Sequence, residues 1–299
     1  MAANESLILL TGATGYVGGR LLPVLEEQGR KVRCLARTPE KLRDKLGKGS
    51  EAVKADLLDP ASLERAMEGV GAAYYLVHSM EAGAGFAEME RKSAQNFADA
   101  ACKAGVERIL YLGGLAHGDG LSPHLHSRQE VGRVLRESGV KTIEFRASVI
   151  LGAGSLSFEL VRSLVERLPA MITPRWVSIC AQPIYIGDVI SYLVAALDIP
   201  LEESRVFEIG GADRVSYLDI MKEQARVTGK KRIMVPVPVL TPWLSSLWLG
   251  MVTPLQAKVG RKLIEGVKNA SVVKDESALH AFDIKPAGMY YALLQANSE

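Results

Sequence analysis

Residues 7–18 read Leu-Ile-Leu-Leu-Thr-Gly-Ala-Thr-Gly-Tyr-Val-Gly, an apolar run of strand length that ends in a glycine motif and continues into a helical pattern. In the spacing Gly12-x-x-Gly15-x-x-Gly18, the first glycine permits a tight turn and the second lets the backbone approach a pyrophosphate. The third lets the helix pack closely on the strand, and the N–H groups at the helix start face the phosphate charge. Because a strand precedes the motif and a helix follows it, the pattern predicts a dinucleotide-binding βα unit.

Length and composition indicate a globular protein with one large domain, or one domain with a small appendage. The chain has 299 residues, of which 48% are hydrophobic and 23% are charged. The formal net charge is only +2, so we expect no nucleic-acid partner. Cys34, Cys102 and Cys180 lie far apart in apolar contexts and predict buried thiols in a reducing compartment. The first residues lack the charged and apolar regions of a signal peptide, so we expect a cytoplasmic protein.

Short apolar segments alternate with helical patterns through the first half of the chain, which predicts an α/β fold with a doubly wound parallel sheet of the Rossmann type. The expected strands are Leu7–Thr11, Lys31–Ala36, Glu51–Lys54, Ala72–Val77, Arg108–Leu112 and Lys141–Arg146. The expected helices are Tyr16–Gln28, Pro60–Met67, Phe86–Ala104 and Pro123–Ser138. We place the dinucleotide-binding domain at residues 1–150. Residues 151–299, with a strand-like Trp176–Ile186, are expected to form a small C-terminal α+β lobe on the substrate side, partly helical and interleaved with the first domain.

The residue that follows the second expected strand selects between the two nicotinamide dinucleotides. NAD sites place an acidic residue here, whereas NADP sites place an arginine near the 2′-phosphate. The chain has Arg37 and no acid, and an arginine can hold a 2′-phosphate through two charge-assisted hydrogen bonds. We therefore expect NADP(H), with NAD as the second choice and with Arg33 and Lys41 as assisting cations. The alternative is that Arg37 only starts a solvated turn.

Four stretches of the chain resemble the atypical short-chain dehydrogenase/reductase families. They are Thr11–Gly18, Leu125–Gly132, Phe145–Ser155, and Leu168-Pro169 with Thr173–Trp176. The branch that they resemble contains bacterial proteins near the NmrA-like regulators and the nucleotide-binding accessory subunit of respiratory complex I, and many members are named as sugar-nucleotide epimerases or reductases. The resemblance implies that Asp56 and Leu57 contact the adenine.

The cofactor set also includes the end of the fourth expected strand, because ligands bind outside the carboxyl ends of the strands in such sheets. Val77 and His78 should therefore lie on the nicotinamide side. The complete candidate cofactor-binding set is Gly12, Thr14, Gly15, Tyr16, Val17, Gly18, Arg37, Asp56, Leu57, Val77, His78 and Arg128.

The chain departs from the catalytic pattern that the resemblance implies. Short-chain dehydrogenases use Tyr-x-x-x-Lys on one helix and a Ser or Thr at the end of the fifth strand. Here His124 aligns with the tyrosine, Arg128 with the lysine, and Gly113-Gly114 with the serine. A spacing of four residues puts His124 and Arg128 on one helical face. Arg128 can clamp ribose hydroxyls or a phosphate but cannot relay a proton. A histidine, with a reference pKa of about 6.5, can donate one.

Two alternatives remain for the histidines. His124 is either a proton donor or a half-solvated residue at the start of its helix. His117, His124 and His126 have no acidic or cysteine partner at ligand spacing, so we expect no metal.

The second half of the chain supplies candidate substrate-side residues, for each of which ordinary loop packing is the alternative. They are Ser148, Ser155, Phe158, Glu159, Arg175, Gln182 and Tyr185. The resulting hypothesis is an NADP(H)-dependent oxidoreductase that acts on a carbonyl or quinone-like acceptor. The alternative is a non-catalytic NADP(H) redox sensor, or an assembly or regulatory factor.

An apolar segment at residues 235–255 contains two tryptophans, and Lys258, Arg261 and Lys262 follow it. Its four prolines argue against a membrane-spanning helix. Trp243, Trp248 and their apolar neighbours recur at helical spacing on one face. The segment therefore predicts either a peripheral contact with the inner face of the membrane, or a lid or homodimer contact.

Overall fold

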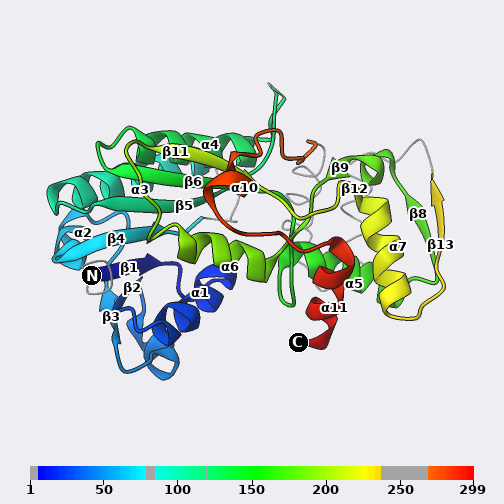
Figure 1. Ribbon diagram of the computed structural model, residues 1–299, viewed down its shortest axis with the longest axis horizontal. Helices are drawn as coiled ribbons and strands as arrows, with labels where there is room; N and C mark the ends of the chain where they lie inside the picture. The colour runs from blue at the N-terminus through cyan, green and yellow to red at the C-terminus, as the bar shows by residue number, and fades with distance from the viewer. Residues whose placement is uncertain (1–5, 79–84, 119, 237–268) are drawn as a thin grey trace.

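The computed structural model describes residues 6–78, 85–118, 120–236 and 269–299. Seven parallel strands form one sheet in the order β11-β6-β5-β4-β1-β2-β3 (Figure 1). The strands are β1 (Leu7–Thr11), β2 (Val32–Ala36), β3 (Ser50–Lys54), β4 (Val70–Tyr75), β5 (Arg108–Gly114), β6 (Lys141–Ala147) and β11 (Arg205–Ile209). The sheet confirms the predicted doubly wound α/β fold.

Helices cover both faces of this sheet. The apolar sides of α2 (Pro60–Met67), α3 (Phe86–Lys103) and α4 (Pro123–Arg136) pack into one core cluster. Those of α1 (Tyr16–Glu27), α6 (Ile186–Ala195) and the short α10 (Ser277–Ala281) pack into a second cluster on the opposite face. Because every strand in the middle of the sheet is covered on both sides, its sequence reads as a nearly continuous apolar run.

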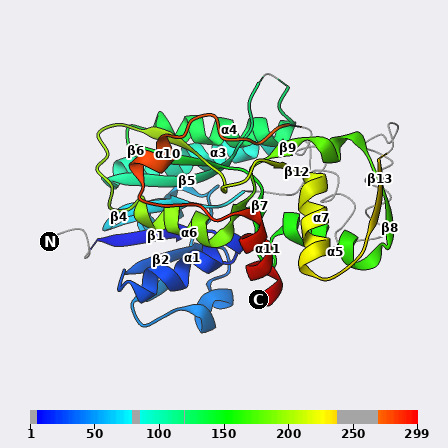
Figure 2. The same ribbon diagram turned by 45° about the vertical axis from the view of Figure 1, so that its right-hand side comes forward.

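A smaller group of elements lies at one end of the sheet, to the right in Figures 1 and 2. It contains α5 (Leu156–Arg167), α7 (Tyr217–Val227), α11 (Met289–Ser298), the 3₁₀ helix η2 (Arg175–Ser178), and the short strands β7 (Ile150–Leu151), β8 (Ala170–Thr173), β9 (Cys180–Ala181), β10 (Ile184–Tyr185), β12 (Val215–Ser216) and β13 (Ile233–Pro236). Residues of α5, α7 and α11 share a third core cluster. Since α6 and β11 return to the main sheet, the two parts are interleaved along the chain. A domain boundary at residue 150 stays a prediction.

The end of β1 is tied to the end of β4 by one buried hydroxyl. Thr11 Oγ1 donates to the Tyr74 carbonyl and accepts from the Leu76 N–H, each at 2.9 Å, and Thr11 is fully buried. This pair of bonds continues the β1–β4 pairing one step past the ladder, which ends at Leu10 and Tyr74. It therefore fixes the point where the glycine motif leaves the sheet.

Two sequence-based expectations were wrong. Trp176–Ile186 is not one strand but η2 followed by the two-residue strands β9 and β10. Pro174 precedes η2 and Pro183 separates β9 from β10, and a proline has no N–H to donate to a ladder. Cys34 is buried and burial raises its pKa to about 12, but Cys102 and Cys180 are exposed. On α3, the preceding residues Ala100 and Ala101 are on the buried side of the helix, and Cys102 is on the exposed side.

We predict that Thr11→Val will lower the free energy of unfolding by about 2–4 kcal/mol, because the change leaves the Tyr74 carbonyl and the Leu76 N–H unpaired in the interior. Valine keeps the shape of threonine, so lost packing contributes little. Urea unfolding measures the change. Thr11→Ser keeps the hydroxyl and should cost less than Thr11→Val; the opposite order would contradict the role of the hydroxyl.

Candidate functional site

A cavity of about 1170 Å³ opens at the carboxyl edge of the sheet. The turn after β1 and the ends of β2, β4, β5 and β6 contribute to it, as do the first turns of α1, α4 and α7. The structure brings every predicted cofactor residue and His124 to this one cavity: Gly12, Thr14, Gly15, Tyr16, Val17, Gly18, Arg37, Asp56, Leu57, Val77, His78, His124 and Arg128. That each of them contacts a cofactor stays a prediction.

The three motif glycines are required by close approaches of the backbone. Gly12 has φ +74°, and a Cβ there would lie 2.7 Å from the Leu76 carbonyl oxygen. A Cβ on Gly18 would lie 2.3 Å from the Gly12 oxygen, so only glycine lets α1 begin beside the turn. A Cβ on Gly15 would be 3.1 Å from the same oxygen, which is tight but tolerable. Gly15 therefore has a weaker structural reason than Gly12 and Gly18 to be glycine.

The first turn of α1 is suited to an anion. Gly15 is its N-cap residue and offers no side-chain oxygen to the turn, and the turn contains no acidic residue. The N–H groups at a helix start have no partner within the helix and carry the positive end of the helix dipole. Together with the close approach that Gly15 allows, this start fits the pyrophosphate of a dinucleotide.

The opposite end of the cofactor region is lined by Arg37, Thr38 and Lys41. Arg37 follows β2 directly and its side chain is exposed. Arg33, which was expected to assist, does not line the cavity. Its guanidinium contacts Glu51 Oε1 at 2.6 Å and the carbonyl oxygens of Ala66 and Glu68. The cations available to a 2′-phosphate in this part of the described chain are therefore Arg37 and Lys41.

Asp56 lies next along this edge, at the end of β3. Its Oδ1 accepts from the Leu58 N–H at 2.9 Å, and its own N–H donates to Ser62 Oγ at 3.0 Å. These bonds fix the backbone of the β3–α2 turn, where Asp56 and Leu57 both line the cavity.

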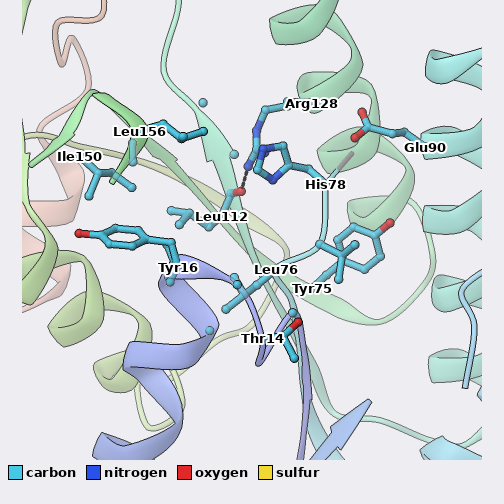
Figure 3. Close-up of a pocket in the computed structure, with 18 of the residues that line it drawn as sticks. Thr14, Tyr16, Tyr75, Leu76, His78, Glu90, Leu112, Arg128, Ile150 and Leu156 are labelled. Atoms are coloured by element: carbon cyan, nitrogen blue, oxygen red, sulfur yellow. Dashed lines mark hydrogen bonds between the residues drawn. The ribbon is translucent and has the colours of Figure 1, made fainter. Parts of the chain in front are cut away.

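Arg128 reaches from α4 to the end of β5. Its guanidinium donates to the Leu112 carbonyl (Figure 3). The Tyr111 hydroxyl donates to the Arg128 carbonyl at 2.8 Å. A Cβ on Gly114 would lie 2.9 Å from Leu125 Cδ2. The Leu125 side chain of α4 thus packs against Gly114, and a side chain at Gly114 would force Leu125 to move.

His124 lies one turn before Arg128 and is half-buried among aromatic rings. Its ring centroid is 5.7 Å from that of His78 and 6.2 Å from that of Phe86, which is nearly parallel to it at 27°. This arrangement puts an imidazole at the rim of the cavity beside the end of β4. Because β4 ends at Tyr75, two residues sooner than expected, Val77 and His78 lie in the loop that follows it.

Glu90 was missed by the sequence reasoning. It lines the cavity from α3, is buried, and accepts a hydrogen bond from Ser127 Oγ at 2.5 Å. Figure 3 shows its carboxylate on the far side of His78 from Arg128. The available signal was an acidic residue on the same helical stripe as the buried Ala94 and Phe97.

Tyr16 lies between the cofactor loop and the second half of the chain, and points toward Ile150 in Figure 3. The Arg20 guanidinium lies 4.5 Å from its ring centroid and donates to the Ala153 carbonyl at 2.7 Å. Burial raises the pKa of Tyr16 to about 12 against the opposing effect of Arg20. The hydroxyl is therefore protonated at neutral pH.

The substrate-side candidates divide into two groups. Ser148 and Ser155 line the cavity. The others have packing roles in the described structure: Phe158 is fully buried, Glu159 accepts from the Gly154 N–H, Gln182 bonds the Gly211 carbonyl and the Val273 N–H, and Tyr185 packs on Tyr291. The side chain of Arg175 lies outside the described part of the chain. Tyr217 and Ser271 also line the cavity, and no local pattern identified them.

Of the apolar segment 235–255, only Val235 and Pro236 lie within the described residues, where they end β13. The predicted membrane, lid or homodimer contact of residues 237–255 therefore lies outside the described residues. In the parts of the chain that are described, no helix has both the length and the apolar character needed to cross a membrane. The same parts hold no cluster of three or more His, Cys, Asp or Glu side chains that could bind a metal ion.

Comparison with known proteins agrees with this geometry. Residues 12–150 match the family described as NAD(P)H-binding. A (4-alkanoyl-5-oxo-2,5-dihydrofuran-3-yl)methyl phosphate reductase of Streptomyces griseus is 29% identical over 233 residues, covering 75% of this chain and 74% of the relative. A ceramide reductase of Caulobacter vibrioides is 25% identical over 236 residues, covering 78% and 74%.

Among solved structures, the triphenylmethane reductase of Citrobacter sp. superimposes with a TM-score of 0.80 at 18% identity, over 98% of this chain and 99% of that one. A second structure of that enzyme, complexed with NADP(H), gives a TM-score of 0.76 over 97% and 99% at the same identity. These likenesses show the fold, and the matched domain shows the class of cofactor. Residues 12–150 are therefore an NAD(P)H-binding domain, in a chain that is similar to proteins named as reductases and has the fold of the triphenylmethane reductase.

Proposed function

We propose that this protein is an NADPH-dependent reductase of an uncharged carbonyl or quinone-like acceptor. The observation that carries the proposal is the division of one cavity into two chemically different ends. One end has the glycine loop, the start of α1 and the cations Arg37 and Lys41. The other end is lined by aliphatic and hydroxyl side chains. A cavity of about 1170 Å³ has room for more than the dinucleotide's polar half.

The preference for NADPH rests on Arg37. It follows β2 where NAD-binding proteins carry an acid that bonds the ribose hydroxyls. The neighbouring cavity residues Thr38 and Lys41 add a hydroxyl and a second cation. Such a group favours the 2′-phosphate of NADPH, because phosphate is bound best by a guanidinium with further donors around it.

The acceptor is proposed to be uncharged because the described cavity lining that follows β6 in the chain offers no ion-pair partner. The described cavity residues from the end of β6 onward are Ala147, Ser148, Val149, Ile150, Gly154, Ser155, Leu156, Ser157, Tyr217 and Ser271, none of which carries a full charge. A phosphate or carboxylate desolvated here would lack compensation. Of the two relatives, one is named for a methyl phosphate and one for ceramide; this lining favours a substrate without a phosphate.

Two residues are proposed to serve the reaction. NADPH supplies a hydride when it is bound. His124, half-buried at the cavity rim, is proposed to donate the proton, because an imidazole can do so near neutral pH. Arg128 is proposed to orient the cofactor, since its guanidinium is fixed by the Leu112 carbonyl and cannot lose a proton at this pH.

A second candidate function is a non-catalytic NADPH-binding sensor or assembly factor. It is favoured by one specific observation: the serine position holds Gly113-Gly114, and Arg128, in the lysine position, is bonded to the Leu112 carbonyl. The two candidates differ in turnover. A reductase oxidises NADPH in the presence of some member of an aldehyde, ketone and quinone panel, whereas a sensor binds NADPH and oxidises it with none.

We predict that Gly15→Ala and Gly18→Ala will act in different ways. A methyl on Gly15 stands where the pyrophosphate approaches, so NADPH affinity should fall at least tenfold with little change in stability. A methyl on Gly18 meets the Gly12 oxygen, so the free energy of unfolding should fall by about 1–3 kcal/mol. Calorimetric titration and urea unfolding measure the two effects. Equal effects of the two variants on both measurements would contradict this division.

We predict that Arg37→Asp will lower NADPH affinity at least tenfold and leave NADH affinity equal or improved, because the new carboxylate repels a 2′-phosphate but can bond ribose hydroxyls. Calorimetric titration with both dinucleotides measures this. Arg43→Asp is the matched control: it makes the same charge change on the 3₁₀ helix η1 (Pro39–Lys45), and Arg43 is exposed and outside the cavity lining. A similar loss of NADPH affinity in both variants would mean that the loss comes from the change in net charge. It would contradict a direct contact between Arg37 and the 2′-phosphate.

We predict that His124→Ala will lower kcat at least 10²-fold with any panel compound that the wild type reduces, while the NADPH dissociation constant changes less than threefold. His126→Ala is the matched control, because His126 lies on the same helix but is exposed and does not line the cavity. Unchanged turnover in His124→Ala would remove that residue from the mechanism.

A further inference from the structure

Three hydroxyl groups meet at the acceptor end of the cavity, and we call them the hydroxyl cluster: Ser148, Tyr217 and Ser271. Ser148 Oγ lies 2.9 Å from Ser271 Oγ and 2.7 Å from the Ser271 carbonyl oxygen. The Tyr217 hydroxyl is hydrogen-bonded to the Ser271 side chain. All three residues line the cavity, although they come from three segments that lie far apart in the sequence.

The fold brings these segments together through the short strand β9. Ala181 of β9 pairs with Val215 of β12 on one side and forms a bridge with Ser271 on the other. Tyr217 follows β12 as the first residue of α7, whose start is held by a reciprocal cap between Ser216 and Asp219. The tyrosine therefore projects from a backbone that is fixed on both sides.

The two serines are equally fixed. Ser148 and Ser271 are both buried. The Ser271 carbonyl accepts from the Gln182 N–H at 3.0 Å, and the Ser271 N–H donates to the Cys180 carbonyl at 3.1 Å. Ser148 Oγ also accepts from the Gln182 N–H, at 3.1 Å. A serine has a single hydroxyl proton, so when Ser148 donates to Ser271 Oγ, the Ser271 hydroxyl can donate to the Tyr217 oxygen.

Burial raises the pKa of Tyr217, so its hydroxyl is protonated at neutral pH and can act as a donor. The surrounding wall is mostly apolar, with Val149, Ile150 and Leu156 in the lining. In binding sites of this kind, a few convergent polar groups within an apolar wall fix the orientation of a ligand. Neutral hydroxyl donors match an uncharged oxygen acceptor, whereas they do not compensate the charge of a buried phosphate.

We propose that the hydroxyl cluster is the binding site for the carbonyl oxygen of the acceptor, with Tyr217 as the donor to that oxygen. The inference deepens the proposed reductase function and rests on it. It makes Tyr217 a specificity-determining residue, because a site with a hydroxyl donor discriminates against a ligand of the same shape that has no oxygen.

The test compares two probes of similar shape, 1,4-naphthoquinone and naphthalene, which lacks the oxygens. Their affinities are measured by fluorescence titration of the full chain, without cofactor and with NADP⁺, so that no reduction takes place. The wild type should bind the quinone more tightly than naphthalene. Tyr217→Phe should weaken quinone binding about three- to tenfold, the effect of one neutral hydrogen bond, and leave naphthalene binding unchanged.

Tyr290→Phe is the matched control, because Tyr290 is an exposed tyrosine on α11 and does not line the cavity. It should bind both probes as the wild type does. Urea unfolding checks that Tyr217→Phe is folded, and Ser271→Ala, with the same expected result, serves as a second variant if it is not.

Three outcomes would overturn the proposal: a wild type that binds the quinone no better than naphthalene, a Tyr217→Phe variant with wild-type quinone affinity, or an equal loss of both probes. A separate titration of the wild type with NADPH measures binding at the cofactor end of the cavity. Its failure would count against the proposed function, whereas the comparison of the two probes judges the hydroxyl cluster alone.

Discussion

The approach of the β1–α1 turn to the end of β4 is the constraint on which the rest of the structure depends. Thr11 bonds both the Tyr74 carbonyl and the Leu76 N–H, and Gly12 passes so close to Leu76 that a Cβ would lie 2.7 Å from its oxygen. Together they fix the carboxyl edge at the centre of the sheet. They also aim the start of α1 into the cavity, where its N–H groups can bind an anion. The cofactor end is thus a consequence of how two central strands finish.

A second close approach sets the position of α4 against the sheet. Gly114 and Gly132 let α4 lie against the sheet: a Cβ on Gly132 would be 2.3 Å from Glu144 Oε2, and one on Gly114 would meet Leu125. Glu144 is fully buried and forms ion pairs with Arg136 and Arg146, so this side of the helix is occupied by a paired charge. At this distance Arg128 reaches the Leu112 carbonyl. Gly114 and Arg128 therefore belong to one contact between α4 and the end of β5.

The sequence was informative wherever a short pattern determines the structure. Gly12, Gly15 and Gly18, the alternation of strands and helices, and the basic residue after β2 all depend on neighbours within about twenty residues. Glu90 was missed because one acid on an apolar stripe resembles an ordinary surface residue until Ser127 is placed beside it. Tyr217 and Ser271 were missed for a stronger reason. Their proximity is created by β9, a two-residue strand bounded by irregular backbone, and no periodicity reports such a pairing.

The two ends of the cavity are therefore built by different means, and this bears on how they are coupled. The cofactor end is formed by residues that are close in the sequence. The acceptor end depends on hydrogen bonds between distant segments, such as those from the Gln182 N–H to Ser148 Oγ and to the Ser271 carbonyl. Tyr16 joins the two ends, because it follows Gly15 of the glycine motif and its hydroxyl packs against Gly152. A Cβ on Gly152 would lie only 2.3 Å from that hydroxyl oxygen. Arg20 packs on that ring and bonds the neighbouring Ala153 carbonyl. A displacement of the loop must therefore be taken up by the residues that begin the acceptor end, since close-packed groups cannot move independently.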